Sequence, residues 1–213
     1  AEKFDTIRTR KGISPFLDPS ESKYDHFISG HAGTALAAGV GFATANPDKK
    51  VVVIVGDASI SNGHSLEALN YIGYKKLDNI VVIVNDNDMS IGENVGFISK
   101  FLKRVISSGK YQNFREDVKT FINKIKANRL KNTLERMESL GFRFFSVSEG
   151  NNIEKLLPML RKVKDLKGPI ILLVKTEKGK GYCFAEENKE KFHGIAPFNI
   201  ETGNTYKSSV SYS

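Results

Sequence analysis

The chain has 213 residues, of which 40% are hydrophobic and 26% charged, and its formal net charge is +8. This length can bury a core in one large domain or two small ones, and the composition is that of a globular protein. No apolar run reaches the roughly 18 residues of a membrane-spanning helix, the first residues do not form a signal peptide, and a single cysteine, Cys183, excludes an internal disulfide. We therefore expect a cytoplasmic protein with no membrane partner.

The excess positive charge lies in one segment of the chain. Residues 100–136 contain eleven Lys and Arg against three Asp and Glu, which accounts for the whole net charge. Aromatic residues are sparse there, and no motif of a nucleic-acid-binding fold occurs. We expect a solvated, mobile basic connection at about 100–131 in preference to a polyanion site, and no nucleic-acid partner.

Hydrophobic pattern and breaker residues predict strands that alternate with helices along the chain. The predicted elements, in order, are an irregular approach (4–24), a tight turn (30–34), a helix (34–45), a strand (51–55), a helix (62–71), a strand (79–84), a helix (134–140), a strand (143–147), a helix (153–166) and a strand (169–174). Such alternation predicts an α/β fold with a doubly wound, mostly parallel sheet and helices on both faces. The continuous apolar strands predict that both faces are covered.

Polar residues follow two of these strands at the point where each strand ends. Asp57 comes directly after “VVVIVG”, and “NDND” (85–88) ends the next strand. Ligands of doubly wound sheets bind beyond the carboxyl ends of the strands, and carboxylate and amide oxygens suit Mg²⁺ or Ca²⁺. The turn “DASISNGHS” offers backbone N–H groups and a helix N-terminus to an anion. The alternative is that Asp57 caps a turn and “NDND” is a plain polar loop.

These residues belong to a longer pattern. Gly56-Asp57-Ala58 is followed, after 26 residues, by Asn85-Asp86-Asn87, which resembles the thiamine-diphosphate motif. Around it stand “YDHFISGHAGTALAAGVGFA”, “GDASISNGHSLEALNYIG”, “VNDNDMSIGENVG”, “DLKGPIILLVKTEKGKGY” and “KFHGIAPFNIETG”. Their order is that of the 1-deoxy-D-xylulose 5-phosphate synthases, and the chain resembles this family over nearly its whole length, apart from the basic middle. The resemblance implies the thiamine-diphosphate-binding fold.

The resemblance also implies an activity, cofactors and partners. Members of the family condense pyruvate with glyceraldehyde 3-phosphate, with loss of CO₂, for isoprenoid precursor and thiamine biosynthesis, and they use thiamine diphosphate and Mg²⁺. The implied partners are these two substrates, the remaining domains of the enzyme or a partner chain, and a second copy in a homodimer. We expect residues 1–213 to be a single, incomplete domain that binds the diphosphate half of the cofactor. The family's upstream histidines and downstream glutamate have no counterpart here, so we expect the isolated chain to be inactive.

Individual roles follow from the resemblance position by position. The implied metal ligands are the side chains of Asp57 and Asn87 and the backbone carbonyl of Met89. The implied cofactor contacts are Gly30, His31, Ala32, Ala58, Ser59, Asn87 and Tyr182. Lys178 and His193 are the implied catalytic residues of the same cavity.

Two departures from the family pattern affect these roles. Ala58 stands where the family has a second glycine, which is acceptable only if that position does not need a positive φ. The stretch “SVSEGNNIEKLL” replaces a more regular family segment, so no role is carried over to it.

Other functions fit parts of the same pattern. The chain could be the amino-terminal subunit of a split transketolase or of a 2-oxo-acid dehydrogenase. It could also be a noncatalytic module for a Mg²⁺-nucleotide, although neither the phosphate-loop pattern GxxxxGK[ST] nor the GxGxxG spacing occurs. His31 could simply complete a turn, and Lys178 and Lys180 could be solvated loop charges.

Overall fold

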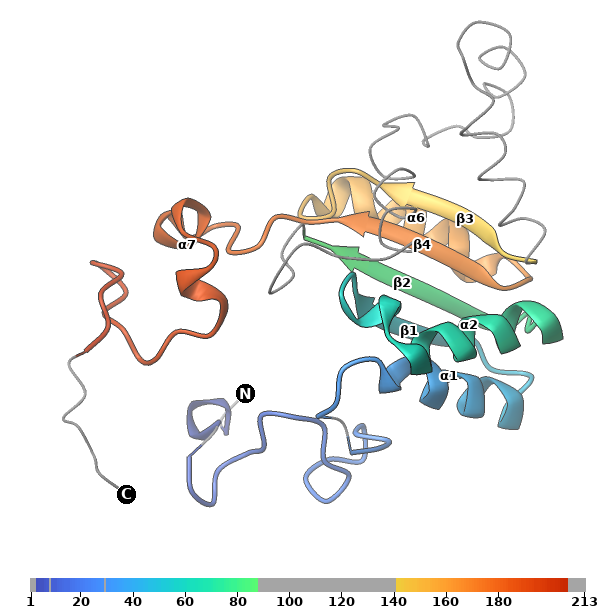
Figure 1. Ribbon diagram of the computed structural model, residues 1–213, viewed down its shortest axis with the longest axis horizontal. Coiled ribbons are helices and arrows are strands. Elements are labelled where there is room, and N and C mark those ends of the chain that lie inside the picture. Colours follow the sequence, from blue (N-terminus) through green and yellow to red (C-terminus); the bar gives the residue numbers. More distant parts are fainter. Residues whose placement is uncertain (1–2, 8, 29, 88–140, 207–213) are drawn as a thin grey trace, which may run out of the picture.

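The computed structural model describes residues 3–7, 9–28, 30–87 and 141–206. Its centre is a four-stranded sheet with the order β1-β2-β4-β3, in which every pair of neighbours is parallel (Figure 1). The strands are β1 (Val51–Gly56), β2 (Ile80–Asp86), β3 (Arg143–Val147) and β4 (Ile170–Lys175). All four carboxyl ends therefore lie at the same edge of the sheet.

Helices cover both faces of this sheet. Helices α1 (Thr34–Ala45) and α2 (Gly63–Lys75) pack together on one face, whereas α6 (Ile153–Asp165) lies on the other (Figure 1). A fourth helix, α7 (Cys183–Glu187), lies beyond the carboxyl edge, and short 3₁₀ turns occupy Phe4–Thr6, Ser59–Ser61 and Lys191–His193. The predicted doubly wound architecture is confirmed.

Local sequence explains where the main helices begin and end. The Asn62 side chain caps α2 by accepting from the Ser65 amide at 2.9 Å, and Asn152 caps α6 in the same way toward Glu154. At the end of α1, the Asn46 side chain donates to the Phe42 carbonyl at 3.1 Å. Gly39 lets this helix approach β1, because a Cβ there would lie 2.3 Å from Val53 Cγ2.

The alternation of side chains along each strand divides the core into two layers. On β4, Ile171 and Leu173 join the layer beneath α1 and α2, and Leu172 joins the layer beneath α6. All three are almost fully buried, which matches the prediction of a central strand covered on both faces.

The prediction that both faces are covered is wrong for β1. Its inward residue Val53 is 6% exposed, but Val52 and Ile54 on the opposite face are 54% and 67% exposed. The reason lies in the strand order: β1 is an edge strand, and α6 packs over β3 and β4 at the other side of the sheet. A continuous apolar run does not distinguish these two positions.

Two predictions fall outside the described residues. These are the helix at 134–140 and the mobile basic connection at about 100–131. In the described part of the chain, no helix is long and apolar enough to cross a bilayer.

Candidate functional site

The two predicted metal-ligand side chains lie at the carboxyl ends of neighbouring strands. Gly56 pairs with Asn85 in the β1–β2 register, and the Asp57 amide donates to the Asn85 carbonyl at 3.1 Å. Asn87 follows the last residue of β2. Asp57 and Asn87 therefore leave paired strands within two positions of one another, as predicted, whereas Met89 lies outside the described residues.

The other polar residues at the end of β2 make structural contacts, which the sequence alone did not distinguish from metal binding. The Asn85 side-chain oxygen accepts from the Thr176 hydroxyl at 2.6 Å and so ties β2 to the end of β4. The carboxylate residue Asp86 is only 3% exposed, and its carbonyl accepts from the Thr176 amide at 2.8 Å. Of the described residues of “NDND”, Asn87 is the one that follows the strand instead of belonging to it.

The backbone after Asp57 accommodates the alanine that replaces the family's glycine. Ala58 has φ −69° and ψ −39°, which is ordinary right-handed helical geometry, so a Cβ causes no strain there. No described residue accepts a hydrogen bond from the Ala58 amide, and this residue is exposed. The side chain that caps α2 is that of Asn62.

The turn that contains Gly30, His31 and Ala32 lies beside the one that contains Ala58 and Ser59. The Asn62 side chain, at the end of the second turn, donates to the Ala32 carbonyl at 2.8 Å. Within the first turn, the Thr34 hydroxyl donates to the His31 carbonyl at 3.0 Å, and His31 itself is exposed. The structure thus brings together two segments that are almost 30 positions apart in the chain.

The predicted catalytic residues form a second group. Lys178 Nζ and His193 Nδ1 are 2.5 Å apart. Tyr182, between them in the chain, donates from its hydroxyl to the Ile200 carbonyl at 2.9 Å. Its ring lies in a cluster of aromatic rings, which we call the aromatic cluster: Tyr182, Phe184, Phe192 and Phe198. Desolvation by these neighbours raises the pKa of the Tyr182 phenol.

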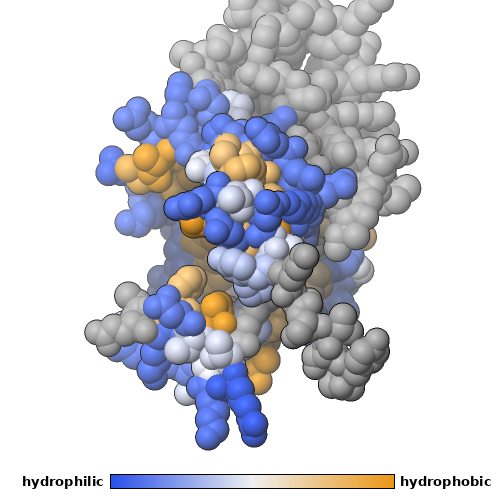
Figure 2. All heavy atoms as spheres, turned by 90° about the vertical axis from the view of Figure 1, so that its left-hand side faces the viewer, coloured by the Kyte–Doolittle hydropathy of each residue, from blue (hydrophilic) through white to orange (hydrophobic). Residues whose placement is uncertain are grey.

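The two groups are not joined to each other in the described part of the chain. There, no hydrogen bond, ion pair or ring contact connects Lys178, Tyr182 or His193 with the turns at 30–32 and 58–59. Both groups lie on the side toward which the strands point, and Figure 2 shows that this side is mainly hydrophilic with small hydrophobic patches.

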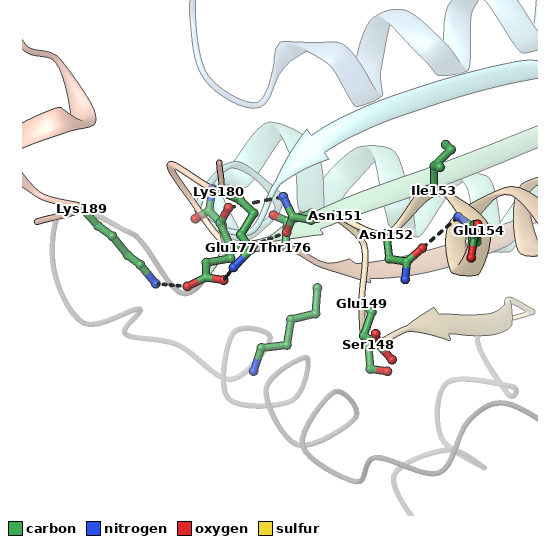
Figure 3. A pocket seen from close by; sticks show the side chains of 12 residues that line it. Ser148, Glu149, Asn151, Asn152, Ile153, Glu154, Thr176, Glu177, Lys180 and Lys189 are labelled. Atoms are coloured by element: carbon green, nitrogen blue, oxygen red, sulfur yellow. Dashed lines mark hydrogen bonds and ion pairs between the residues drawn. The ribbon is translucent and has the colours of Figure 1, made fainter. Parts of the chain in front are cut away.

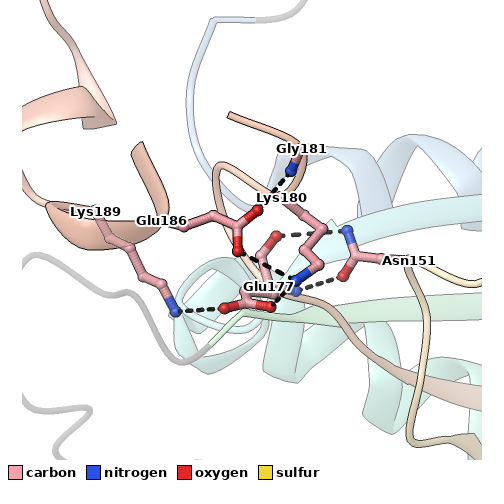
Figure 4. A network of polar contacts seen from close by, with 6 residues as sticks. All are labelled: Asn151, Glu177, Lys180, Gly181, Glu186 and Lys189. Atoms are coloured by element: carbon pink, nitrogen blue, oxygen red, sulfur yellow. Dashed lines mark hydrogen bonds and ion pairs between the residues drawn. The ribbon is translucent and has the colours of Figure 1, made fainter. Parts of the chain in front are cut away.

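A polar network anchors the loop that follows β4. Lys180 Nζ lies 3.1 Å from carboxylate oxygens of both Glu177 and Glu186, and the Gly181 amide donates to Glu186 at 2.8 Å (Figure 4). The hydrogen bond from Lys180 lowers the pKa of Glu177, and the bond from the Gly181 amide lowers that of Glu186. The contact with Glu177 raises the pKa of Lys180. Lys180 is thus an anchor of this loop.

A cavity of about 860 Å³ opens between the ends of β3 and β4 (Figure 3). Asn87 forms part of its wall, so the cavity adjoins the predicted metal ligands. Lys180 and Lys189 also line it, but both contact the carboxylate of Glu177, at 3.1 and 3.5 Å. Lys175 lines it as well, and the three lysines are balanced in formal charge by three glutamates of the lining, Glu149, Glu154 and Glu177.

The donor set at the sheet edge has the chemistry of a Mg²⁺ site rather than a zinc site. No group of three or more His, Cys, Asp or Glu that could hold a metal ion occurs among the described residues. One carboxylate and one amide oxygen, from Asp57 and Asn87, are hard ligands that leave several positions for phosphate oxygens and water. The residues present therefore fit Mg²⁺ bound jointly with a diphosphate.

Comparison with solved structures places the fold among the transketolases. The chain superposes on a transketolase from Pichia stipitis with a TM-score of 0.56 and 20% identity, covering 82% of this chain and 24% of that one. It superposes on the transketolase from Campylobacter jejuni with a TM-score of 0.51 and 25% identity, covering 76% and 22%. The chain therefore has the thiamine-diphosphate-binding fold of transketolase-like enzymes.

Comparison of sequences gives the family. Residues 1–176 match the model of the amino-terminal part of 1-deoxy-D-xylulose-5-phosphate synthase. The chain is 82% identical to the 1-deoxy-D-xylulose-5-phosphate synthase of Fusobacterium nucleatum over 100% of its length, and 41% identical to that of Clostridium acetobutylicum over 95%. The chain belongs to the 1-deoxy-D-xylulose-5-phosphate synthase family. It spans 38% and 36% of the length of these two relatives.

Proposed function

We propose that this chain is the diphosphate- and Mg²⁺-binding part of a 1-deoxy-D-xylulose 5-phosphate synthase. The complete enzyme would condense pyruvate with glyceraldehyde 3-phosphate and release CO₂, in isoprenoid precursor and thiamine biosynthesis. Family membership sets aside the split transketolase, the 2-oxo-acid dehydrogenase subunit and the nucleotide module as explanations of the same motif.

The observation that carries this proposal is the pairing of β1 with β2. It brings Asp57 and Asn87 to one edge of the sheet, next to the turn at Ala58 and Ser59. Parallel α/β sheets bind their ligands at this edge. In the proposal, Asp57, Asn87 and the Met89 carbonyl hold Mg²⁺, while the amides of Ala58 and Ser59 receive the diphosphate. Gly30, His31 and Ala32 contact the cofactor from the neighbouring turn.

Thiamine diphosphate, when bound, supplies the carbanion that attacks a carbonyl group, and the protein supplies orientation and electrostatics. Asp57 contributes a negative charge that offsets Mg²⁺, which in turn offsets the diphosphate. Ala58 is exposed and its amide has no acceptor among the described residues, so we infer that this amide receives a phosphate oxygen. These are the contributions that the chain's own residues make to binding.

Lys178 and His193 act as a pair in this proposal. The hydrogen bond between Lys178 Nζ and His193 Nδ1 fixes the orientation of the imidazole ring. We infer that the ring nitrogen not engaged by Lys178 is the one that holds a substrate oxygen. Tyr182, whose ring contacts that of Phe192 next to His193 in the chain, contacts the cofactor in this proposal.

The implied partner domains correspond to the part of the relatives that this chain does not span. Several large apolar side chains before α1 are exposed, among them Phe16 at 54% and Ile28 at 77%. We infer that the other domains of the enzyme pack against this side and complete the site, that the complete enzyme is a cytoplasmic homodimer, and that residues 1–213 alone do not turn over.

The test uses the full-length enzyme with thiamine diphosphate and Mg²⁺. CO₂ release from pyruvate should depend on glyceraldehyde 3-phosphate, and thiamine diphosphate binding measured by calorimetry should depend on Mg²⁺. His193→Gln should lower kcat and leave cofactor affinity within about twofold, whereas His64→Gln, an exposed histidine on α2, should change neither. Mg²⁺-dependent binding without CO₂ release would overturn the reaction and keep the cofactor, and absence of binding would overturn both.

A further inference from the structure

We propose that Asn62 and Ser65 are positioning residues that hold the two cofactor-facing turns at a fixed separation. This inference rests on the proposed function, because the turns in question are those assigned to thiamine diphosphate. Neither residue is among the implied cofactor contacts. Both act through the backbone of residues that are.

The side-chain amide of Asn62 makes hydrogen bonds to two segments of the chain. Its Oδ1 accepts from the Ser65 amide at 2.9 Å and so begins α2. Its Nδ2 donates to the carbonyl of Ala32 at 2.8 Å, 30 positions earlier in the chain. Because the amide is planar, fixing one end by the cap also fixes the direction of the other.

Ser65 makes the second tie, and it is fully buried at 0% exposure. Its hydroxyl lies 2.7 Å from the Ser59 carbonyl and 3.3 Å from the Gly33 carbonyl. One hydroxyl hydrogen serves the closer acceptor, Ser59, and the second carbonyl stays within reach. A buried hydroxyl is costly without a partner, so this arrangement favours one separation of the two turns.

Gly33 makes the close approach possible. Its φ is +84°, and a Cβ at this position would lie 1.6 Å from Asn62 Nδ2. A residue with a side chain would therefore be strained in its backbone and would displace the amide that reaches Ala32. The glycine and the asparagine form a matched pair across the two turns.

Fixed separation matters because both turns must meet one ligand at the same time. Hydrogen-bond donors stabilise a charged group only when they are already aimed at it, and a displacement of about 1 Å is enough to lose much of the effect. The ties from Asn62 and Ser65 supply this alignment before the ligand arrives. Asn62 and Ser65 act through the backbone carbonyl groups of Ala32 and Ser59.

Asn62→Ser in the full-length enzyme should remove the hydrogen bond to the Ala32 carbonyl and keep the cap of α2. Serine caps helices about as well as asparagine, but its short hydroxyl cannot also reach Ala32. We expect Mg²⁺-dependent thiamine diphosphate affinity to fall about tenfold or more, a loss typical of groups that orient ligand-binding residues. Ser65→Ala should do the same. Hydrogen exchange of β1 and β2 should stay protected in Asn62→Ser, which shows that the fold persists.

Asn79→Ser is the matched control at the other end of the sheet. The Asn79 side chain is buried, and like that of Asn62 it ties backbone segments together, here by donating to the carbonyls of Ala43, Asn46 and Lys49 at 2.9 to 3.0 Å. Its replacement should lower the melting temperature and leave cofactor affinity unchanged. Equal losses of affinity in Asn62→Ser and Asn79→Ser would overturn the positioning role, as would unchanged affinity in Asn62→Ser and Ser65→Ala. A wild-type enzyme that binds no thiamine diphosphate would instead overturn the proposed function.

Discussion

The two groups of candidate site residues are held in place by different forces. The turns at 30–33 and 57–62 rest on the layer beneath α1 and α2, where Leu36, Ile60 and Ile72 are at most 1% exposed. The loop after β4 has no such support: within residues 177–206, only Ala185 and Gly203 are buried. Exposed ion pairs and the aromatic cluster hold it instead.

Because of this difference, we expect the two groups to differ in stability. Apolar burial is strong and involves no titrating group, whereas exposed ion pairs contribute little and are screened by salt. The loop that carries Lys178, Tyr182 and His193 should therefore open more easily than the turns that carry Asp57 and Ala58. Under the proposed function, the cofactor would thus bind to the more rigid half of the site, with a more adaptable half beside it.

Ile72→Ala should have the largest effect on stability. Ile72, on the buried side of α2, is 0% exposed, and removal of its side chain leaves a cavity that costs about 2–5 kcal/mol. Hydrogen exchange of β1 and β2 in the full-length protein should accelerate accordingly, while exchange in residues 183–193 should change much less. Equal acceleration in both regions would show that they open as one unit.

Asp57→Asn tests the rigid half as a binding site. Loss of the charged ligand should weaken Mg²⁺-dependent thiamine diphosphate binding by at least about 10–100-fold, which is the effect of removing groups that only orient a metal ligand. Protection of β1 and β2 should persist, because the Asp57 amide keeps its hydrogen bond to Asn85. Asp48→Asn, in an exposed turn at the opposite edge, is the control and should bind normally. Unaltered affinity in Asp57→Asn would defeat the metal assignment.

The elements were predictable because their signals are local. Strands β1, β2 and β4 begin and end within two residues of the predicted apolar runs, and α1 has the predicted bounds of 34–45. The same local reading placed Asp57 and Asn87 after their strands. Continuous apolar runs and small capping residues decide such features within a few positions.

The relations between distant segments were not predictable. Nothing in the apolar runs distinguishes the edge strand β1 from the central β4, so the exposure of Ile54 came only from the strand order. Likewise, the bond from Asn62 to Ala32 depends on how two turns meet in space. The pairing of Lys178 with His193 is of the same kind.

Phe198→Ala tests the adaptable half. The Phe198 ring centroid lies 5.2 Å from that of Phe192 and 5.9 Å from that of Tyr182, and each such pair is worth about 0.5–1.5 kcal/mol. We expect faster hydrogen exchange in residues 183–193 and unchanged exchange in β1 and β2. Phe4→Ala, a 66% exposed ring of the amino-terminal segment, should leave both regions unchanged. A matching acceleration in the sheet would contradict the separation of the two halves.

Acidification should give the smallest effect, and its direction follows from the polar network. The pKa values of Glu177 and Glu186 are lowered from 4.5, and that of Lys180 is raised from 10.5. The carboxylates therefore stabilise the loop fully above about pH 4.5, and this contribution is lost as the pH falls through their lowered values. The contribution of Lys180 is complete below 10.5 and is lost above it. Below pH 4.5, exchange in residues 177–187, corrected for its intrinsic pH dependence, should accelerate slightly.

Glu186→Gln identifies the source of this acid sensitivity. Glutamine keeps an oxygen for the Gly181 amide, whose bond to Glu186 measures 2.8 Å, but it removes the charge that faces Lys180 at 3.1 Å. The variant should open slightly more at neutral pH and respond less to acid, because one of the two titrating carboxylates is gone. The turn at Ala58 and Ser59 has no share in the network and should show the same exchange at both pH values. An acid response of the same size in the variant and the wild type would show that other carboxylates hold the loop.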